Sequence, residues 1–299
     1  MLKDKLTLDY LYPRIIQKRT YQRIKARTID LVYRVYDRLL FPQKKYNQYA
    51  ILLTKKGDHR NALTARPFKT LPLSLNFEEF SNVTDFGLYD LVVPMTVDDV
   101  TRCNASRNVI KSDVIPIPSA DAIMICDRKD LLIEKLRECG LGCLVPAQRD
   151  NYPYILKKNA GDFSKNAYII TSKQDEDTHK SLLDDPDYFT QELIQGKKEF
   201  ASHIVFKNGK IIANVTVCHR YAEAAYLQGK TTSNSRNRIA NRHQAAFTQV
   251  LNLIGFEGLC CIDYKEVNGQ PKIFEINPRF GGSLRFYFRG LLRQLGSAS

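Results

Sequence analysis

Two Asn-Gly pairs constrain the fold of the second half of the chain. Asn208-Gly209 and Asn268-Gly269 each separate two runs of strand-like composition. Both residue types tolerate the positive φ of a tight hairpin turn, so each pair predicts two antiparallel strands joined by a short turn. From residue 152 onward the sequence therefore favours an α+β arrangement with a helix over 238–253. The expected strands cover residues 154–157, 167–170, 188–193, 200–206, 210–217, 259–264 and 272–276.

The part of the chain before residue 152 has a different sequence pattern. Residues 49–54 and 88–94 are continuous apolar runs, typical of parallel strands that are buried on both faces. Residues 122–126 form a weaker run of the same kind. Helical patterns around 96–110 and 128–139 alternate with these runs, which predicts a small parallel α/β domain over 46–120.

Positive charge is concentrated near the N-terminus. The chain has 299 residues and a formal net charge of +13, and residues 1–69 hold 17 Lys and Arg against five Asp and no Glu. Residues 14–40 carry apolar side chains at helical spacing, so a basic helical segment is expected over 1–45. Its apolar stripe can pack on the protein's own core, or the helix can lie on an anionic membrane surface or an acidic partner. Nucleic acid is not an expected partner, because the rest of the chain does not share the excess charge.

The remaining composition excludes several classes of protein. No apolar run approaches the roughly 20 residues that span a bilayer, and the first residues lack the apolar core of a secretory signal, so a cytoplasmic protein is expected. The seven cysteines form no C-x-x-C pair, which predicts reduced and mostly buried thiols. The segment Gln228-Gly-Lys-Thr231 ends like a phosphate-binding P-loop, but Ala224 stands where that motif requires a glycine.

Three oxygen-bearing side chains are expected to meet near the last hairpin. Glu275 and Asn277 are two residues apart on a predicted strand, so both face the same side of it. Asp263 ends the neighbouring strand, across the turn at Asn268-Gly269. Carboxylate and amide oxygens suit magnesium or manganese, with substrate phosphates filling the other positions around the ion. Arg279 then offers a forked cation for phosphate or carboxylate.

The run Glu275-Ile-Asn-Pro-Arg279, followed by Gly281-Gly282 and preceded by an Asp on the adjacent strand, resembles the metal-binding end of the ATP-grasp superfamily. The closest similarity is to its carbamoyl-phosphate synthetase and biotin carboxylase branch. This resemblance implies an ATP-grasp fold over 121–299, with two α+β lobes, 121–190 and 191–299, that hold ATP between them. The small α/β domain and the basic helical segment are expected to precede it.

The resemblance also assigns roles to residues around the nucleotide. Lys129 and Lys157 are implied to contact the phosphates, and residues 159–166 to form the loop that covers them. This loop departs from the family pattern, because Lys158 stands where proline is frequent and Gly161 is its only glycine. The other implied contacts are those of Glu192 with the adenine amino group, of the Leu193 and Ile194 backbone with the adenine edge, of Glu199 with the ribose hydroxyls and of Lys230 with the γ-phosphate.

The activity that the resemblance implies is that of an ADP-forming ligase that joins a carboxylate to an amine through an acyl phosphate. ATP and Mg²⁺ are the expected cofactors, and Arg279 and Lys230 are the expected catalytic side chains. Two alternatives stay open at this point. The chain can be an ATP-grasp phosphotransferase with a different acceptor, or a module that binds ATP without catalysis, which the glycine-poor loop favours.

Overall fold

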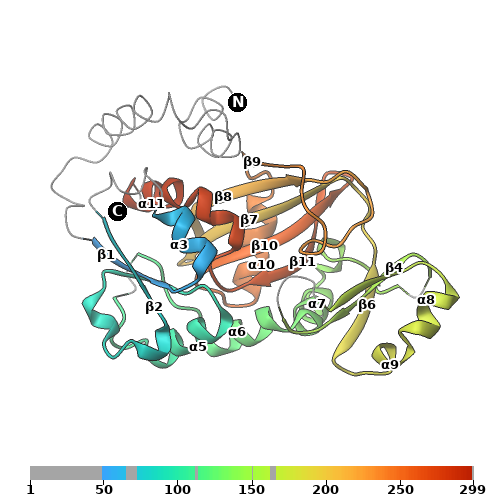
Figure 1. Ribbon diagram of the computed structural model, residues 1–299, viewed down its shortest axis with the longest axis horizontal. Coiled ribbons are helices and arrows are strands. Elements are labelled where there is room, and N and C mark those ends of the chain that lie inside the picture. The colour runs from blue at the N-terminus through green and yellow to red at the C-terminus, as the bar shows by residue number, and fades with distance from the viewer. Residues whose placement is uncertain (1–48, 65–72, 112–113, 150, 162–165, 298–299) are drawn as a thin grey trace.

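The computed structural model describes residues 49–64, 73–111, 114–149, 151–161 and 166–297. The predicted basic helical segment at 1–45 lies outside the described residues. Within the described ranges the chain forms three β-sheets with helices packed against them (Figure 1). Among these elements, no helix combines the length and the hydrophobicity of a membrane span.

The first sheet is parallel, and its central strand β1 (Tyr49–Thr54) confirms the prediction for 49–54. Its neighbours are β2 (Leu73–Glu78), which is not among the predicted strands, and β3 (Leu91–Val93). Strand β3 is shorter than the predicted 88–94, because the 3-10 turn η4 (Phe86–Leu88) occupies the residues before it. A second turn, η3 (Phe80–Asn82), follows β2.

Helix α5 (Val97–Ala105) begins at a capping box that ties it to the first sheet. The Thr96 hydroxyl accepts a hydrogen bond from the Asp99 backbone N–H at 3.1 Å, and the Asp99 carboxylate accepts one from the Thr96 N–H at 2.9 Å. Asp99 also accepts from the hydroxyl of Thr54, the last residue of β1, at 2.6 Å. Helix α3 (Gly57–Leu63) lies directly after β1 on the chain.

The predicted strand at 122–126 is wrong, because these residues belong to helix α6 (Ala120–Asp127). The Ser119 hydroxyl caps this helix by accepting from the Ala122 N–H at 3.2 Å. A short apolar run does not distinguish a strand from a buried helix by periodicity alone. Helix α7 (Lys129–Glu138) agrees with the prediction for 128–139, and the 3-10 turn η5 (Gly142–Leu144) follows it. All seven cysteines are free and five are buried, as predicted.

The second sheet is antiparallel and has the order β5-β4-β6. Its strands lie where the sequence predicts them, at β4 (Tyr154–Lys158), β5 (Ala167–Ile170) and β6 (Tyr188–Glu192). Two short helices lie between β5 and β6, α8 (Lys173–Thr178) and α9 (Lys180–Leu183). Leu182 and Leu183 of α9 pack on the small core of this sheet.

The third sheet has five strands in the order β11-β10-β7-β8-β9, all antiparallel. The two predicted hairpins are confirmed, because Asn208 and Asn268 have positive φ angles of 51° and 50°. The predicted helix at 238–253 starts later than expected, since residues 235–239 form an edge strand instead. The elements of this lobe are β7 (Lys198–Lys207), β8 (Lys210–Arg220), β9 (Ser235–Ile239), α10 (Gln244–Leu253), β10 (Gly258–Val267), β11 (Gln270–Asn277), η6 (Gly282–Phe286) and α11 (Phe288–Ser297).

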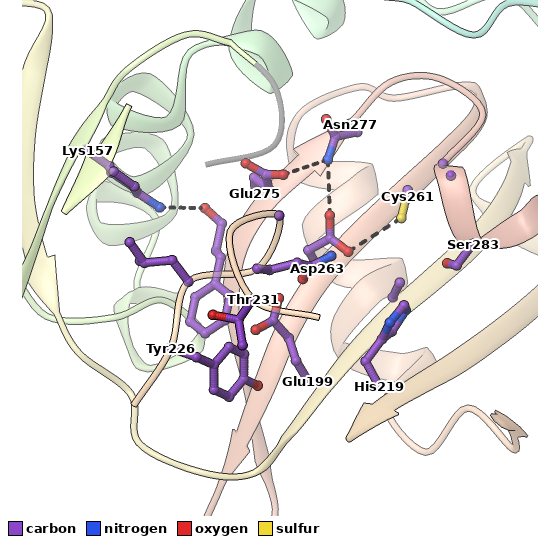
Figure 2. Close-up of a pocket in the computed structure, with 18 of the residues that line it drawn as sticks. Lys157, Glu199, His219, Tyr226, Thr231, Cys261, Asp263, Glu275, Asn277 and Ser283 are labelled. Carbon is purple, nitrogen blue, oxygen red and sulfur yellow. Dashed lines mark hydrogen bonds between the residues drawn. The ribbon is translucent and has the colours of Figure 1, made fainter. Parts of the chain in front are cut away.

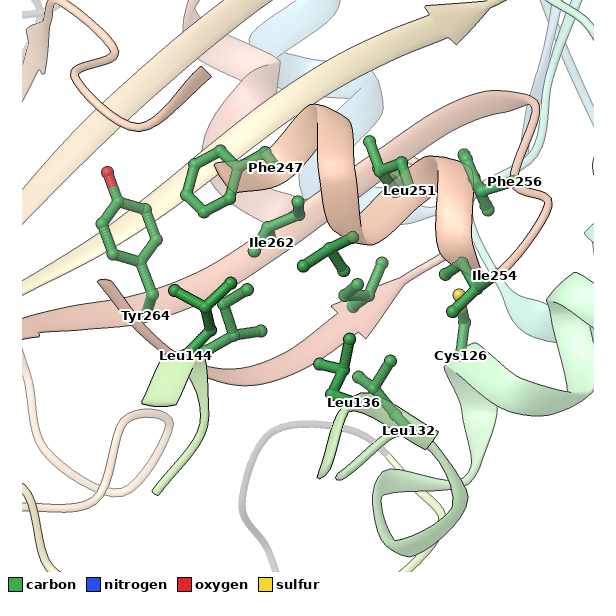
Figure 3. Close-up of a cluster of buried hydrophobic side chains, with 14 of the residues drawn as sticks. Cys126, Leu132, Leu136, Leu144, Phe247, Leu251, Ile254, Phe256, Ile262 and Tyr264 are labelled. Carbon is green, nitrogen blue, oxygen red and sulfur yellow. The ribbon is translucent and has the colours of Figure 1, made fainter. Parts of the chain in front are cut away.

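The two faces of the third sheet differ in character. On one face Ile262 and Tyr264 pack with Phe247 of α10 and with Leu132 and Leu136 of α7 (Figure 3). On the opposite face the polarity of the side chains changes from one end of the strands to the other. Apolar residues at one end pack against α11, and polar residues occupy the other end. Because successive residues of a strand face opposite sides, each central strand has one row that packs on α7 and α10 and one row that is apolar near α11 and polar at the other end.

Candidate functional site

The polar end of the third sheet forms one wall of a cavity of about 720 Å³. The second sheet contributes the facing wall through Ile155 and Lys157 of β4, and residues 226–233 run along the opening. The start of α3 also reaches the cavity. Figure 2 shows polar side chains from several elements converging on this space.

Asp263 and Glu275 lie opposite each other on the neighbouring strands β10 and β11. The Asn277 amide N–H₂ donates to both carboxylates, to Asp263 Oδ2 at 3.2 Å and to Glu275 Oε1 at 2.9 Å (Figure 2). Arg279 in turn donates to Asn277 Oδ1 at 3.0 Å. A register shift after Asp263 interrupts the ladder there, as bulges beside active sites often do. The structure thus brings the three predicted metal ligands together.

The two carboxyl groups have opposite pKa shifts. Burial and the nearby Glu275 charge raise the pKa of Asp263 well above its usual range. Burial also acts on Glu275, but the cations of Lys129 and Lys157 outweigh it and hold the pKa of Glu275 below its ordinary value. The Asn277 amide thus occupies the place between the two carboxylates where the sequence predicts a divalent cation.

This cluster contains two carboxylates and one amide. In the part of the chain that the structure describes, no group of three or more His, Cys, Asp or Glu side chains is arranged around a common metal position. For the Asn277 oxygen to face an ion, the amide has to turn so that its O and N exchange places. The amide orientation follows from the hydrogen-bond network, and a cation in place of the amide N–H₂ would reverse it.

Two buried lysines border the acidic cluster on the side of the second sheet. Lys129 Nζ lies 3.3 Å from Glu275 Oε2 and donates to the Gly161 carbonyl at 3.1 Å. Lys157, 9% exposed, donates to the Phe274 carbonyl at 3.4 Å. Burial and the neighbouring Lys129 lower the pKa of Lys157 to about 7, although the Glu275 charge opposes the shift. Both lysines line the cavity beside the acidic cluster, and their contact with phosphates stays a prediction.

A separate polar group lies further from the cluster, around Glu199. This carboxyl group is 5% exposed, and burial raises its pKa to about 7 against the opposing charge of Lys265. Lys265 Nζ donates to the Ile194 carbonyl at 2.8 Å and lies 4.0 Å from the centre of the Tyr226 ring. Leu193 and Ile194 also line the cavity, and their contact with an adenine edge stays a prediction.

The Glu192 side chain does not line this part of the cavity. Its carboxylate accepts from the Ala147 N–H at 3.2 Å and lies 3.8 Å from Arg149, and it is not among the residues that line the cavity. Its neighbour Gln191 lines the cavity instead, because adjacent residues of β6 face opposite sides. The buried Oε1 atom of Gln191 has no hydrogen-bond partner among the described residues.

Lys230 also lies differently from the prediction. Its Nζ donates to the Ala167 carbonyl of β5 at 2.6 Å and lies 4.5 Å from the centre of the Tyr168 ring. Gly229 and Thr231 line the cavity, but Lys230 does not. No helix follows Thr231 directly, which agrees with the prediction that this segment is not a P-loop.

Several lining residues were not predicted from the sequence. Lys56 and His59 come from the start of α3 and line the cavity together with Ser283. His203 Nε2 lies 2.8 Å from Ser283 Oγ, and His219 is buried beside Arg236 on the adjacent strand. The strand period suggests His219 as a cavity residue, but no local pattern marks Lys56 or His59, which the fold brings in from another sheet.

The segment that forms most of the cavity has counterparts among known proteins. Residues 126–283 match a family model described as an ATP-grasp domain. No curated protein sequence matches the chain. The matched segment contains α7, the second sheet and all of the third sheet.

Solved structures show the same two-lobe fold at low sequence identity. An ADP complex of N5-carboxyaminoimidazole ribonucleotide synthetase is 12% identical, with a TM-score of 0.55 over 80% of this chain and 72% of that chain. D-alanine–D-alanine ligase from Bacillus anthracis is 13% identical, with a TM-score of 0.52 over 84% and 97%. Biotin carboxylase from Campylobacter jejuni is 14% identical, with a TM-score of 0.51 over 89% and 67%. The predicted fold class is confirmed, whereas the similar scores single out no branch.

Proposed function

Because this chain belongs to the ATP-grasp family, we propose that it is an ATP- and Mg²⁺-dependent ligase that joins a carboxylate to an amine. One observation supports the proposal above the others. Asp263, Glu275 and Asn277 meet in a single cavity beside the ammonium groups of Lys129 and Lys157. Oxygen ligands next to two cations form an environment suited to a triphosphate with its magnesium.

The donor set and the cavity fit these ligands. The volume of about 720 Å³ lies within the range usual for small-molecule sites. In the proposal Asp263, Glu275 and Asn277 hold Mg²⁺, or Mn²⁺, whose charge offsets that of the phosphates. Because a metal ligand has to be deprotonated, the raised pKa of Asp263 makes metal binding at this cluster dependent on pH.

The nucleoside end of the proposal follows the buried groups on β6 and β7. Glu199 accepts from the ribose hydroxyls, and the backbone at Leu193 and Ile194 borders the adenine. Gln191 takes the polar contact that the resemblance assigned to Glu192, since Gln191 lines the cavity and its buried Oε1 has no hydrogen-bond partner among the described residues. The exocyclic amino group of adenine is a donor of the kind that this oxygen lacks.

In the proposed reaction a substrate carboxylate oxygen attacks the γ-phosphorus of ATP. The bond between that phosphorus and the β–γ bridging oxygen breaks, and ADP leaves with the electron pair. An amine then attacks the carbonyl carbon of the acyl phosphate, phosphate departs and the nitrogen loses a proton. Arg279 and the two lysines stabilise the charge that develops during both steps, which is an electrostatic form of catalysis.

Trapping with hydroxylamine tests this function. With MgATP and a panel of carboxylates, the protein is expected to release ADP only when an acid acceptor is present, and hydroxylamine is expected to convert the acyl phosphate to a hydroxamate. ADP release without hydroxamate would identify a phosphotransferase. Binding of nucleotide without ADP release from any acceptor would identify the non-catalytic module, which the glycine-poor loop at 159–166 favours.

A further inference from the structure

The Ser283 side chain lines the cavity and has a buried hydrogen-bond partner. Ser283 belongs to η6 and is half-buried. Its Oγ atom lies 2.8 Å from Nε2 of His203, a fully buried side chain of β7. Among the described residues, neither of these two side chains forms another hydrogen bond. The direction of this single hydrogen bond therefore decides what the hydroxyl can offer to a ligand.

The His203 imidazole is neutral, because burial lowers its pKa to about 3, with further contributions from the charges of His219 and Arg279. A neutral imidazole has one N–H donor and one nitrogen that accepts. The buried Nδ1 atom of His203 has no partner in the part of the chain that the structure describes. A proton on Nδ1 would leave a buried N–H without an acceptor, which is rarer in proteins than an acceptor without a donor. The proton thus belongs on Nε2, which donates to Ser283 Oγ.

A serine hydroxyl that accepts a hydrogen bond still has its own hydrogen to donate. Because the imidazole occupies the buried side of Ser283, the hydroxyl hydrogen is available to an acceptor in the cavity. The same arrangement opposes a nucleophilic role for Ser283. In that role His203 would have to accept the hydroxyl proton, with a carboxylate on Nδ1 to orient the ring, and no described residue contacts Nδ1.

Contacts across the third sheet connect this hydroxyl to the acidic cluster. Cys261 lies opposite His203 in the ladder between β10 and β7, and its Sγ donates to Asp263 Oδ1 at 3.6 Å. A Cβ on Gly281 would lie 2.8 Å from Cys261 Sγ and 2.5 Å from His203 Cε1, so the loop before η6 packs closely on both side chains. The Ser283 hydroxyl is therefore held next to the row of side chains that begins with Asp263.

In the proposed reaction, the attacking oxygen and the departing ADP oxygen lie roughly in line through the γ-phosphorus. Figure 2 shows Ser283 on the opposite side of Asp263 from Lys157 and Tyr226, which border the proposed nucleotide. The substrate carboxylate then approaches from the side of Ser283. Resting on the proposed ligase function, we propose that the Ser283 hydroxyl donates to the substrate carboxylate, at the oxygen that does not attack, and that His203 is the positioning residue that fixes the hydroxyl as a donor.

Nitrogen-15 NMR of the imidazole rings tests the direction of the hydrogen bond without any ligand. In protein that carries labelled histidine, the His203 signals are those that disappear in His203→Gln. Near pH 7 the proton is expected on Nε2, with Nδ1 unprotonated. A proton on Nδ1, or on both ring nitrogens, would overturn the inference.

Steady-state kinetics test the contact with the substrate. ADP release is measured with MgATP and with acetate, succinate, alanine or glutamate as the acid. Ser283→Ala is expected to raise the KM for the acid about tenfold or more, because the lost hydrogen bond is to a charged group, while the KM for ATP changes by less than about twofold. Ser283→Thr keeps a hydroxyl and is expected to rescue the KM for the acid. Ser181→Ala is the matched control, because Ser181 is exposed and does not line the cavity.

Variants of His203 test its positioning role. His203→Gln keeps an N–H donor near the place of Nε2, whereas His203→Leu removes the donor at similar volume. The KM for the acid is expected to rise about tenfold in His203→Leu and less than about threefold in His203→Gln. The double variant His203→Leu with Ser283→Ala is expected to match Ser283→Ala alone, because His203 acts through the hydroxyl. Unchanged affinity for MgADP shows that each variant is folded.

Equal KM values for the acid in Ser283→Ala and Ser181→Ala would overturn the inference, and so would additive effects of the His203 and Ser283 substitutions. Loss of MgADP binding in Ser283→Ala would also overturn it, since the side chain would then support the fold instead of the substrate. Failure of the ligase function has a different signature, namely no ADP release with any acid although the proton lies on Nε2 of His203, and the proposed substrate contact is then overturned with it.

Discussion

Asp263 and Glu275 face each other across two strands, yet only Asp263 has a raised pKa. The difference arises from Lys129 and Lys157, whose ammonium groups lie near Glu275 and favour its charged form. Burying several charged groups in one cavity opposes folding unless partners compensate them. In the proposed function, a bound nucleotide and metal ion supply such partners.

His219 gives a pH-dependent prediction at the same scale. Burial, with the charge of Arg236, lowers the pKa of His219 to about 4. Between pH 6.5 and about 4 the unfolded chain binds a proton at this residue and the folded chain does not. The free energy of unfolding should therefore fall, for this residue, by about 1.4 kcal/mol for each unit that the pH drops in this window.

Urea denaturation of the protein and of His219→Gln at several pH values between 7 and 4.5 measures this contribution. The variant is expected to lose less stability on acidification than the unchanged protein. Identical pH slopes for the two proteins would show that His219 titrates normally in the folded state.

At the scale of helices and strands, local sequence signals determine some parts of the fold and leave others undetermined. The Asn268-Gly269 turn and the period-2 pattern around it determine a hairpin. The cluster of Asp263, Glu275 and Asn277 follows because its members lie on that hairpin. Strand β9 lacked such a signal, because its arginines suit an exposed edge strand and also a helix. In β6, a difference of one residue exchanges the faces of Gln191 and Glu192, which a spacing argument does not resolve.

Other parts of the site depend on contacts between distant segments. Lys56 and His59 reach the cavity because α3 packs against η6, more than 200 residues further along the chain. No pattern within either segment encodes that contact, which arises from the packing of the first sheet on the third. The sequence therefore predicts the lining that the second and third sheets contribute better than the lining that the start of α3 contributes.

Gly281 provides a prediction about the loop that joins β11 to η6. A Cβ at this position would lie 2.5 Å from His203 Cε1 and 2.8 Å from Cys261 Sγ, so Gly281→Ala forces the loop away from β7 and β10. The variant is expected to lose about 1–3 kcal/mol of unfolding free energy. At Gly282 the nearest atom to an added Cβ is His59 Nε2 at 3.9 Å, an ordinary contact distance.

Gly282→Ala is therefore the matched control, and a change within about 0.5 kcal/mol is expected for it. Denaturant unfolding of both variants measures the difference. Equal stability of the two variants would mean that the loop does not pack on the sheet as closely as described.

At the scale of the whole molecule, the cavity depends on the relative position of the second and third sheets. Lys230 connects them, because it lies in the segment that follows β8 and donates to Ala167 of β5. Without this hydrogen bond, the segment that follows β8 is held less firmly against the second sheet at the edge of the cavity. Lys230→Gln is therefore expected to raise the KM for ATP several-fold while kcat changes by less than about twofold.

Steady-state measurement of ADP release gives both constants. A large fall in kcat with an unchanged KM would contradict this role and would instead support direct contact of Lys230 with the transferred phosphoryl group. Lys210→Gln, on the exposed part of β8, is the control for a change of charge alone.

The proposed function requires a divalent ion that is held between β10 and β11 when nucleotide is bound. Electron paramagnetic resonance of Mn²⁺ with ADP measures that ion directly, in the protein, in Glu275→Gln and in the control Glu138→Gln on the exposed end of α7. We expect nucleotide-dependent Mn²⁺ binding that Glu275→Gln weakens at least about tenfold and that the control retains. Equal Mn²⁺ affinity in all three proteins would contradict the assignment of this cluster as the metal site.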